Sequence, residues 1–179
     1  MGIILASQSP RRRELLERMG LSDFLIRPAQ GEENFDPSLT PAQLVEALSR
    51  QKAEEISAGA GPEDIVIAAD TVVSVDGREH TVYTGVTVRR GGETVTEHEA
   101  TAVRFRSLTG EEIAAYVATG EPMDKAGAYG IQGYGCLLVE GISGDYFNVV
   151  GLPVCRLGKI LARFGVEPLR LAAEKERRA

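Results

Sequence analysis

The feature that most constrains this chain is the run DIVIAADTVVSV at residues 64–75. It is long, rich in β-branched residues and apolar at both odd and even positions, which is typical of a central strand buried on both faces. Shorter strands are predicted at residues 3–7 and 24–27, each followed by a helix. The order β-α-β-α-β, followed by hairpins and helices, indicates an α/β fold with a mixed twisted sheet and flanking helices.

Three helices have recognisable start signals. They are predicted over residues 10–19, ending at Gly20, from residue 41 to near Gly59, and from residue 110 through 117. An N-cap side chain or a capping box precedes each of them. The capping residues are Ser9 with Pro10, Thr40 with Gln43, and Thr109 with Glu112.

The rest of the chain is predicted to contain two hairpins, a loop and one last helix. The first hairpin joins HTVYTGVTVRR to ETVTEHEATAVRFRSL through a Gly-Gly turn. EPMDKAGAYGIQGYG is rich in glycine and is predicted to be a loop. CLLVEGISGDYFNVVG is predicted to be a second hairpin turning at residues 141–144, and Pro153 to start a last helix through Phe164. The tail AAEKERRA is expected to be solvated.

Composition excludes several classes of protein. An apolar fraction of 43% and a charged fraction of 26% are ordinary for a globular domain, and the net charge of −6 argues against a non-specific nucleic-acid binder. Cys136 and Cys155 show neither metal-ligand spacing nor a disulfide framework, which favours the reducing cytoplasm. Arginines follow the apolar run at residues 3–6, the reverse of a signal peptide, and no segment approaches membrane-spanning length.

The sequence SQSPRRREL places Arg11, Arg12 and Arg13 in the first turn of a helix, where the helix dipole is already positive. Free backbone N–H groups, serine hydroxyls and arginines there favour a phosphate or carboxylate site. The alternative is a capped helix with a solvated basic turn, in which Glu17 pairs with Arg13. The junction alone does not decide between these interpretations.

Asp70 lies within the apolar run and is costly to bury unless it meets a cation, a metal or several hydrogen-bond donors. Ligands of α/β sheets bind beyond the carboxyl ends of such strands, so we expect Asp70 to be functional. The alternative is an aspartate that caps a local bend with help from Thr71.

The glycine-rich segment carries Asp124, Lys125 and Gln132 among residues that permit close backbone approach to a ligand. The pair Glu32–Glu33 and the lone Lys52 are more typical of a solvated surface. His80 and His98 lack metal-ligand spacing. Together, the amides, arginines, lysine and carboxylates favour a hydrolase of phosphate anhydrides that uses a divalent metal such as Mg²⁺.

Five segments resemble, in order, the motifs of the Maf family of nucleoside triphosphate pyrophosphatases, also called septum formation inhibitors. They are LASQSPRRRELL, QKA, AADTVV, GEPMDKAGAYGIQG and GDYFNVVGLP. The resemblance implies a single Maf-like domain over residues 1–179. Its fold would be two-lobed with a central cleft, similar to inosine triphosphatases, and it would hydrolyse a nucleoside triphosphate to the monophosphate and pyrophosphate.

The resemblance also implies roles for individual residues. Asp70 matches the general base, with Arg12, Lys52 and Gln132 as further catalytic residues. Glu33 and Asp70 would hold a divalent metal, Mg²⁺ or Mn²⁺. The positions implied to bind substrate are Ser7, Arg11, Arg12, Thr71, Lys125 and Gln132.

Arg13 lies outside the family motif and is expected to face solvent. Arg12, Thr71 and Gln132 together resemble the branch of the family that prefers dTTP and UTP. A glutamine amide can pair with the donor and acceptor edge of uracil or thymine.

The chain departs from the family pattern near residues 77–80. Relatives usually have a segment with Gly-Lys-Pro and a further helix after ADTVVSVDG, whereas here DGR runs directly into EHTVYTGV. About twenty residues of the pattern are therefore absent, including a lysine expected at the phosphates. Either the printed sequence omits a segment of the real chain, which the intact REHTVYTG favours, or the deletion is genuine and activity is impaired. A measured mass above that of the printed sequence would exclude a genuine deletion.

The main hypothesis is a cytoplasmic, metal-dependent pyrophosphatase for dTTP, UTP or modified pyrimidine nucleotides. The alternative is a catalytically impaired, nucleotide-binding regulator of cell division. The expected partner is a nucleoside triphosphate, with no nucleic acid and no membrane, and the resemblance suggests a homodimer.

Overall fold

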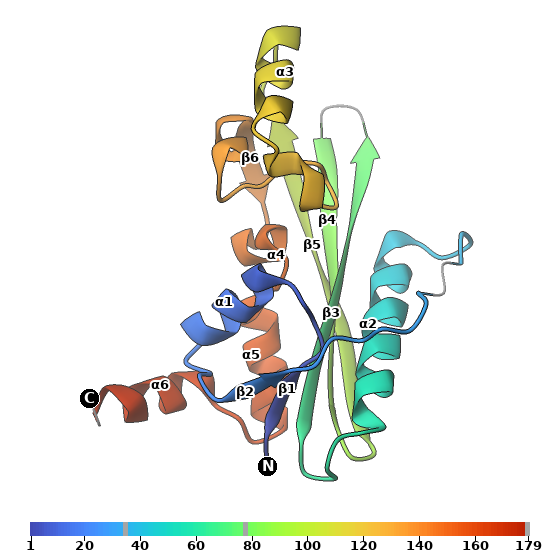
Figure 1. Cartoon of the computed structure of the whole chain (residues 1–179), viewed down its shortest axis with the longest axis vertical. Coiled ribbons are helices and arrows are strands. Elements are labelled where there is room, and N and C mark those ends of the chain that lie inside the picture. Colours follow the sequence, from blue (N-terminus) through green and yellow to red (C-terminus); the bar gives the residue numbers. More distant parts are fainter. Residues whose placement is uncertain (34–35, 77–78, 178–179) are drawn as a thin grey trace.

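The computed structural model describes residues 1–33, 36–76 and 79–177 (Figure 1). The departure predicted near residues 77–80 falls partly outside these ranges. In chain order the elements are β1 (Ile3–Leu5), α1 (Pro10–Arg18), β2 (Phe24–Ile26), α2 (Pro41–Ser57), β3 (Ile65–Asp76), β4 (Glu79–Arg90), β5 (Glu93–Phe105), α3 (Gly110–Ala118), the 3-10 helices η1 (Glu121–Asp124) and η2 (Tyr134–Leu137), β6 (Val139–Ser143), α4 (Tyr146–Val150), α5 (Val154–Arg163) and α6 (Pro168–Glu176).

The strands form one mixed sheet in the order β2-β1-β3-β4-β5-β6. β1 is parallel to β2 and β3, whereas β3, β4, β5 and β6 are antiparallel neighbours. Short β1 pairs only with the first residues of β3, and the rest of β3 continues past it. The predicted mixed α/β sheet is confirmed.

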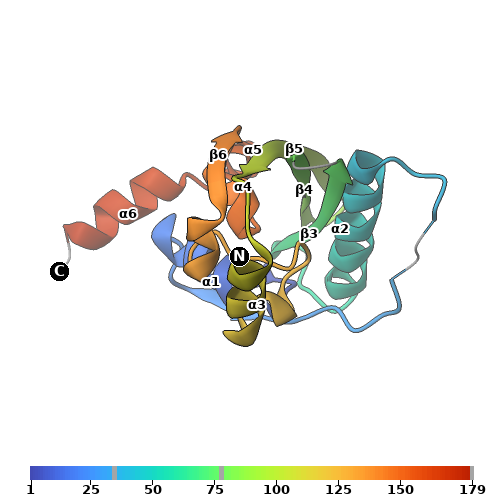
Figure 2. The same ribbon diagram turned by 90° about the horizontal axis from the view of Figure 1, so that it is seen from above.

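Helices cover both faces of the sheet (Figures 1 and 2). α2 lies on one face, and α1, α4 and α5 lie on the other. Side chains of β3 alternate between the two: Ile65 and Ile67 pack in the core with α1 and α5, whereas Val66 and Ala68 pack against α2. This explains why residues 65–69 are apolar at every position.

The second half of β3 has different surroundings. Beyond Ile67 it has no β1 residue beside it, and Val75 is 73% exposed. The expectation that the whole run is buried on both faces is therefore wrong for this end. Together with the adjoining ends of β4 and β5 it carries α3, η1, η2 and β6, which we call the upper lobe (Figure 1).

A glycine sets how closely α2 approaches the sheet. Gly85 of β4 lies opposite Asp70 of β3 in the antiparallel register. A Cβ added at Gly85 would lie 2.1 Å from the carbonyl oxygen of Val45 in α2, so only glycine fits there. Because α2 approaches the sheet so closely, the side chain of Lys52 on α2 reaches Asp70 on β3.

The three predicted helix starts are confirmed. Ser9 Oγ accepts from the backbone N–H of Arg12, and both Thr40 and Thr109 form complete capping boxes. The Gly-Gly hairpin is also confirmed, with Gly91 at φ 55° in the turn between β4 and β5.

Two predictions near the C-terminus are wrong. Residues 136–151 form no second hairpin: β6 pairs with β5, and α4 follows, because Asp145 caps it by accepting from the N–H of Phe147. The helix α5 is not the last one, since Pro168 starts α6. α6 buries none of its residues and extends away from the body (Figure 2).

The predicted glycine-rich loop is also more regular than expected, because η1 and η2 each give it one short turn of helix. None of the helices in the described ranges has the length and hydropathy needed to cross a membrane.

Candidate active site

A cleft of about 500 Å³ lies where β1 ends beside β3. One side is formed by the start of α1 and the other by the glycine-rich segment 121–133, which belongs to the upper lobe. The polar side chains that line it are Ser9, Arg11, Arg12, Asp70, Thr71, Glu121, Asp124, Lys125, Tyr129 and Gln132. The cleft thus lies at the carboxyl end of β1, and the carboxyl ends of parallel strands are where the sequence analysis expected a ligand site.

Arg12 is held by four hydrogen bonds to three parts of the chain. Its Nε donates to the carbonyl of Gly151 at 2.9 Å, and Nη1 donates to the carbonyl of Ala69 at 2.7 Å. Nη1 also donates to Ser7 Oγ at 3.3 Å, and Nη2 to Thr71 Oγ1 at 3.1 Å. These bonds use four of the five N–H groups of the guanidinium.

Burial lowers the pKa of Arg12, and the nearby carboxylate of Asp70 opposes that effect. A guanidinium stays charged at neutral pH even so. Ser7 is buried, and its Oγ accepts from Arg12 and from the N–H of Ser9. The buried hydroxyl of Ser7 thus supports Arg12 through a hydrogen bond. One of the five guanidinium N–H groups takes no part in the four hydrogen bonds described above.

Arg11 and Arg13 differ, as predicted. Arg11 lines the cleft, and its Nη1 donates to Asp124 Oδ2 at 3.2 Å. Arg13 is exposed and pairs with Glu17 one helical turn away at 2.9 Å. The prediction that Arg13 faces solvent is confirmed.

Of the three kinds of partner that could offset the burial of Asp70, the structure provides a cation. Lys52 of α2 donates its Nζ to Asp70 Oδ1 and also lies 2.8 Å from Glu33 Oε1. Within the described part of the chain, the hydrogen bonds of the Asp70 carboxylate involve Oδ1 alone. Lys52 thereby joins the two carboxylates that were predicted to hold a metal.

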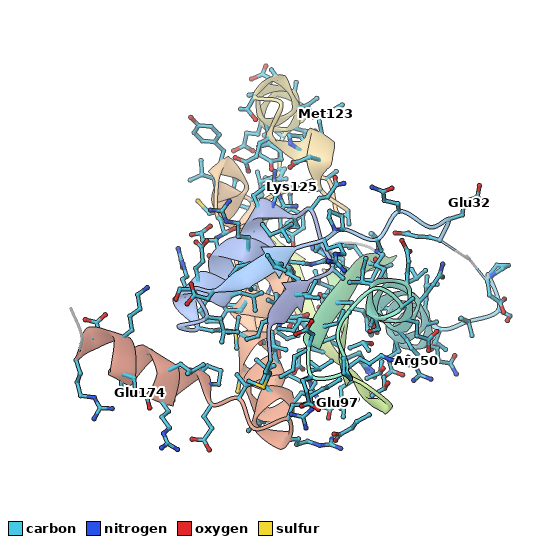
Figure 3. The ribbon with its side chains drawn as sticks, turned by 60° about the horizontal axis from the view of Figure 1, so that its bottom comes forward. Glu32, Arg50, Glu97, Met123, Lys125 and Glu174 are labelled. Carbon is cyan, nitrogen blue, oxygen red and sulfur yellow. The ribbon has the colours of Figure 1, made fainter. Side chains whose placement is uncertain are left out.

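Glu32 and Glu33 separate in space. Glu33 reaches Lys52, whereas the side chain of Glu32 points outward from the loop before α2 (Figure 3). Only the second of the paired glutamates thus belongs to the site.

Thr71 points to the opposite face of β3 from Asp70, because successive strand residues alternate. Its Oγ1 accepts from Arg12 and is 3.0 Å from the hydroxyl of Thr84 on β4. Thr71 therefore links the arginine of α1 to the central strands.

Gln132 and Lys125 reach the cleft from the upper-lobe side. Lys125 donates to the carbonyl of Glu121 at 2.7 Å and to Asp124 Oδ1 at 2.6 Å. Gln132 is exposed and lines the cleft.

The segment that carries Gln132 is organised by a residue that sequence reasoning missed. The carboxylate of Glu121 accepts from the hydroxyl of Tyr116 at 2.9 Å, the N–H of Tyr134 at 2.7 Å and the N–H of Gly135 at 3.0 Å. Burial opposes ionisation of Glu121, but these hydrogen bonds outweigh it and lower its pKa. A Cβ at Gly133 would lie 2.1 Å from Glu121 Oε2, which explains one of the glycines.

The histidines lie outside the group formed by Asp70, Lys52 and Glu33. His80 Nε2 is 2.9 Å from the hydroxyl of Tyr129, and His98 Nδ1 is 2.7 Å from Glu46 Oε1. Neither belongs to a group of three or more potential metal ligands among residues 1–33, 36–76 and 79–177. The two cysteines are unpaired and exposed.

The arrangement brings two kinds of group to one cleft. Basic side chains and the start of a helix form an anion site, and a buried carboxylate bound to a lysine lies beside it. Such a pairing suits the hydrolysis of a phosphate anhydride, because it provides charge for the phosphates and a base for the attacking water.

Comparison with known proteins agrees with this chemistry. The chain is 51% identical to a dTTP/UTP pyrophosphatase of Moorella thermoacetica, over 92% of this chain and 96% of that protein. It is 46% identical to a dTTP/UTP pyrophosphatase of Symbiobacterium thermophilum, over 91% of this chain and 94% of that protein. It is 43% identical to a dTTP/UTP pyrophosphatase of Bacillus pumilus, over 93% of this chain and 98% of that protein.

A solved structure of a dITP/XTP pyrophosphatase from Mycobacterium abscessus is 14% identical, with a TM-score of 0.41, over 69% of this chain and 97% of that one. That likeness is too weak to support any statement about this chain. The model of the family described as Maf-like protein, in contrast, matches residues 2–164. The chain therefore belongs to the Maf family.

Proposed function

We propose that this chain is a nucleoside triphosphate pyrophosphatase that hydrolyses dTTP and UTP to the monophosphate and pyrophosphate. The observation that carries the proposal is the position of Asp70 beside a basic cleft, halfway along β3 and just past the carboxyl end of β1. The dTTP/UTP pyrophosphatases named above support the reaction and the substrates. None of those relatives is named as a regulator of division, so the alternative gains no support.

Asp70 acts as the general base. Its Oδ1 is bound to Lys52, which leaves Oδ2 to take the proton of a water molecule in the cleft. Lys52 orients the carboxylate and, through its second contact, holds Glu33 at the same place. General-base catalysis of this kind contributes about 10²- to 10⁴-fold to a rate.

The phosphate chain binds at the start of α1 and along segment 121–133. Arg11 and Lys125 are the cations with the most freedom to meet it, because Arg12 is committed to the protein through four hydrogen bonds. Arg12 supplies charge and fixes the position of Thr71, and Ser7 supports Arg12 from behind.

The residues present fit a divalent metal whose coordination is completed by substrate. Asp70 and Glu33 offer carboxylate oxygens within reach of one another, since both contact Lys52 Nζ. Mg²⁺ in phosphate sites commonly uses one or two carboxylates together with phosphate oxygens and water, and Mn²⁺ suits the same donors. When bound, the metal would neutralise charge on the phosphates. A calorimetric titration with Mn²⁺ in Glu33→Gln and in unchanged protein tests this assignment.

Gln132 selects the base. Its amide offers one acceptor and two donors at the exposed side of the cleft, which complements the donor and acceptor edge of uracil or thymine.

We also infer that the relatives contain a segment that the printed sequence lacks. The match with the Moorella protein extends over 189 residues yet takes in 92% of this 179-residue chain, or about 165 residues. About two dozen aligned positions therefore have no residue here, in agreement with the departure near residues 77–80. The measured mass of the natural protein tests whether the segment is present.

A pyrophosphate-release assay across dTTP, UTP, other nucleoside triphosphates and modified pyrimidine nucleotides tests the function. We expect pyrophosphate and the monophosphate as products, with dTTP and UTP preferred. Binding of nucleotides without turnover, in excess metal, would favour the regulator instead, and orthophosphate as the product would indicate a different phosphatase. A cytoplasmic location and a homodimer remain part of the proposal, to be checked by fractionation and by light scattering.

A further inference from the structure

Asp124 lies at the end of η1, at the mouth of the cleft, and contacts the two cations there. Its Oδ2 accepts from Arg11 Nη1 at 3.2 Å, and its Oδ1 accepts from Lys125 Nζ at 2.6 Å. Arg11 belongs to α1, whereas Lys125 follows η1 in the upper lobe. One carboxylate therefore connects the two sides of the cleft.

The contacts of Asp124 resemble those of a bound anion. Each oxygen meets a different cation, and both cations line the cleft that the phosphate chain has to occupy. The side chain of Asp124 is 69% exposed, whereas those of Arg11 and Lys125 are 31% and 18% exposed. The carboxylate thus covers the cations from the solvent side.

These contacts are the kind that exchange easily. An ion pair with an exposed partner contributes little net free energy, because water and salt compete with it. Arg12 differs, since four hydrogen bonds hold it and none of them is to a carboxylate. Lys125 keeps one hydrogen bond, to the carbonyl of Glu121, when Asp124 is displaced. Hydrogen bonds from Lys125 and from Arg11 lower the pKa of Asp124, so the carboxylate is ionised at neutral pH.

We propose that Asp124 is an internal substitute for phosphate, which holds Arg11 and Lys125 across the ligand-free cleft and is displaced when a phosphate chain binds. This proposal rests on the proposed function. The carboxylate keeps the two cations in the geometry that the substrate needs. It also weakens the binding of every polyphosphate, the product pyrophosphate included, because each must compete with the carboxylate.

The first test measures binding of inorganic tripolyphosphate by calorimetry in metal-free buffer. Asp124→Asn keeps the size of the side chain and removes its charge, so we expect the dissociation constant to fall on the order of tenfold. Glu140→Gln is the matched control: it removes one carboxylate that pairs with Arg104 outside the cleft, and the constant should stay within about twofold. An unchanged or weaker affinity in Asp124→Asn overturns the proposal.

The second test locates the effect. Because the carboxylate acts through Arg11, the gain from Asp124→Asn should shrink in an Arg11→Gln background, as coupled residues are not additive. Equal gains in both backgrounds contradict a contact through Arg11. Asp124→Glu retains the charge and should remain close to the unchanged protein.

The third test uses turnover. In Asp124→Asn, inhibition of dTTP hydrolysis by pyrophosphate should strengthen by a factor similar to the gain in tripolyphosphate affinity, while Glu140→Gln matches the unchanged protein. If the unchanged protein binds polyphosphate but hydrolyses no nucleotide, the proposed function fails while the binding test of Asp124 still stands. If it hydrolyses dTTP and Asp124→Asn leaves inhibition by pyrophosphate as it was, only the role of Asp124 fails.

Discussion

The two sides of the cleft are built in different ways. On the side of α1 and β3, Arg12 is fixed by hydrogen bonds to the backbone carbonyls of Ala69 and Gly151 and to Ser7 and Thr71. On the upper-lobe side, Lys125 and Gln132 belong to a glycine-rich segment of short 3-10 turns. Its order depends on the carboxylates of Glu121 and Asp124 rather than on a long helix or strand.

This difference indicates that the two sides of the cleft have different roles. The α1 side presents charge and the proposed general base from elements that are packed in the core, which suits groups that must be held in one geometry. The upper-lobe side presents an amide and a lysine that can adjust to the ligand, which suits recognition of the base and release of the product. Substitutions on the first side should therefore lower turnover, and those on the second should change apparent affinity.

The largest effect is expected at Asp70. Asp70→Asn removes the base while keeping the shape, so kcat should fall by about 10²- to 10⁴-fold. Binding of dTTP measured in metal-free buffer should change by less than about threefold, because Arg11 and Lys125 rather than Asp70 then hold the phosphates. A variant with near-normal kcat would falsify the role of Asp70 as the base.

Arg12 should come next, with its neighbour as the control. Lys has no planar fork, so Arg12→Lys cannot reproduce four directed hydrogen bonds. We expect at least about a tenfold loss of kcat/KM and a loss of about 1–3 kcal/mol of stability in urea unfolding.

Arg13→Lys makes the same chemical change one residue away, on an exposed side chain whose only described partner is Glu17. Its activity should match the unchanged protein, and its stability should change by less than about 0.5 kcal/mol. If both lysine variants behave alike, the α1 side is not fixed by Arg12 in the way the contacts suggest.

A different pattern is expected for Glu121, on the upper-lobe side. The variant to test is Glu121→Gln. Its amide offers one acceptor oxygen, whereas the carboxylate of Glu121 accepts three hydrogen bonds, from Tyr116, Tyr134 and Gly135. Segment 121–133 should lose order, so KM for dTTP should rise about tenfold with a smaller change in kcat. Faster amide exchange at residues 130–135 would accompany it, and Glu140→Gln should show neither effect. A fall in kcat with KM unchanged would contradict the division between the two sides.

The α1 side could be predicted from the sequence because its signals are local. Ser9 and Pro10 act through neighbours within a few residues, and the structure confirms the helix start. The apolar run marks Asp70 as a costly carboxylate, and the structure supplies Lys52, one of the three kinds of partner that the sequence left open. Glu121 and Asp124 could not be assigned in this way. The contact between Asp124 and Arg11 joins residues 113 positions apart, so it depends on how the lobes pack.

The error over residues 136–151 has a similar cause. The β-prone sequence YFNVV predicted a strand, but the structure buries Asn148 and Val150, and Asn148 donates to the carbonyl of Val82 on β4. Tertiary contacts and the Asp145 cap outweigh the local preference. The roles of Ser7, Lys125 and Gln132 toward substrate stay predictions until the assays above are done.

The smallest effect is expected at His80, which ties β4 to Tyr129 in the upper-lobe side of the cleft. Burial lowers the pKa of His80 below 6.5, so the unfolded chain binds a proton more readily than the folded one. Stability should therefore rise with pH through the interval just below 6.5 and be lost as the pH falls through it. His80→Gln should reduce the change in melting temperature between about pH 5.5 and pH 7.5, an interval in which carboxylates titrate little. The control variant His98→Gln should keep the part of that change that His80 contributes. If His80→Gln keeps the full slope, the imidazole does not enter the folded state neutral, and the anchor at Tyr129 is weaker than the 2.9 Å contact indicates.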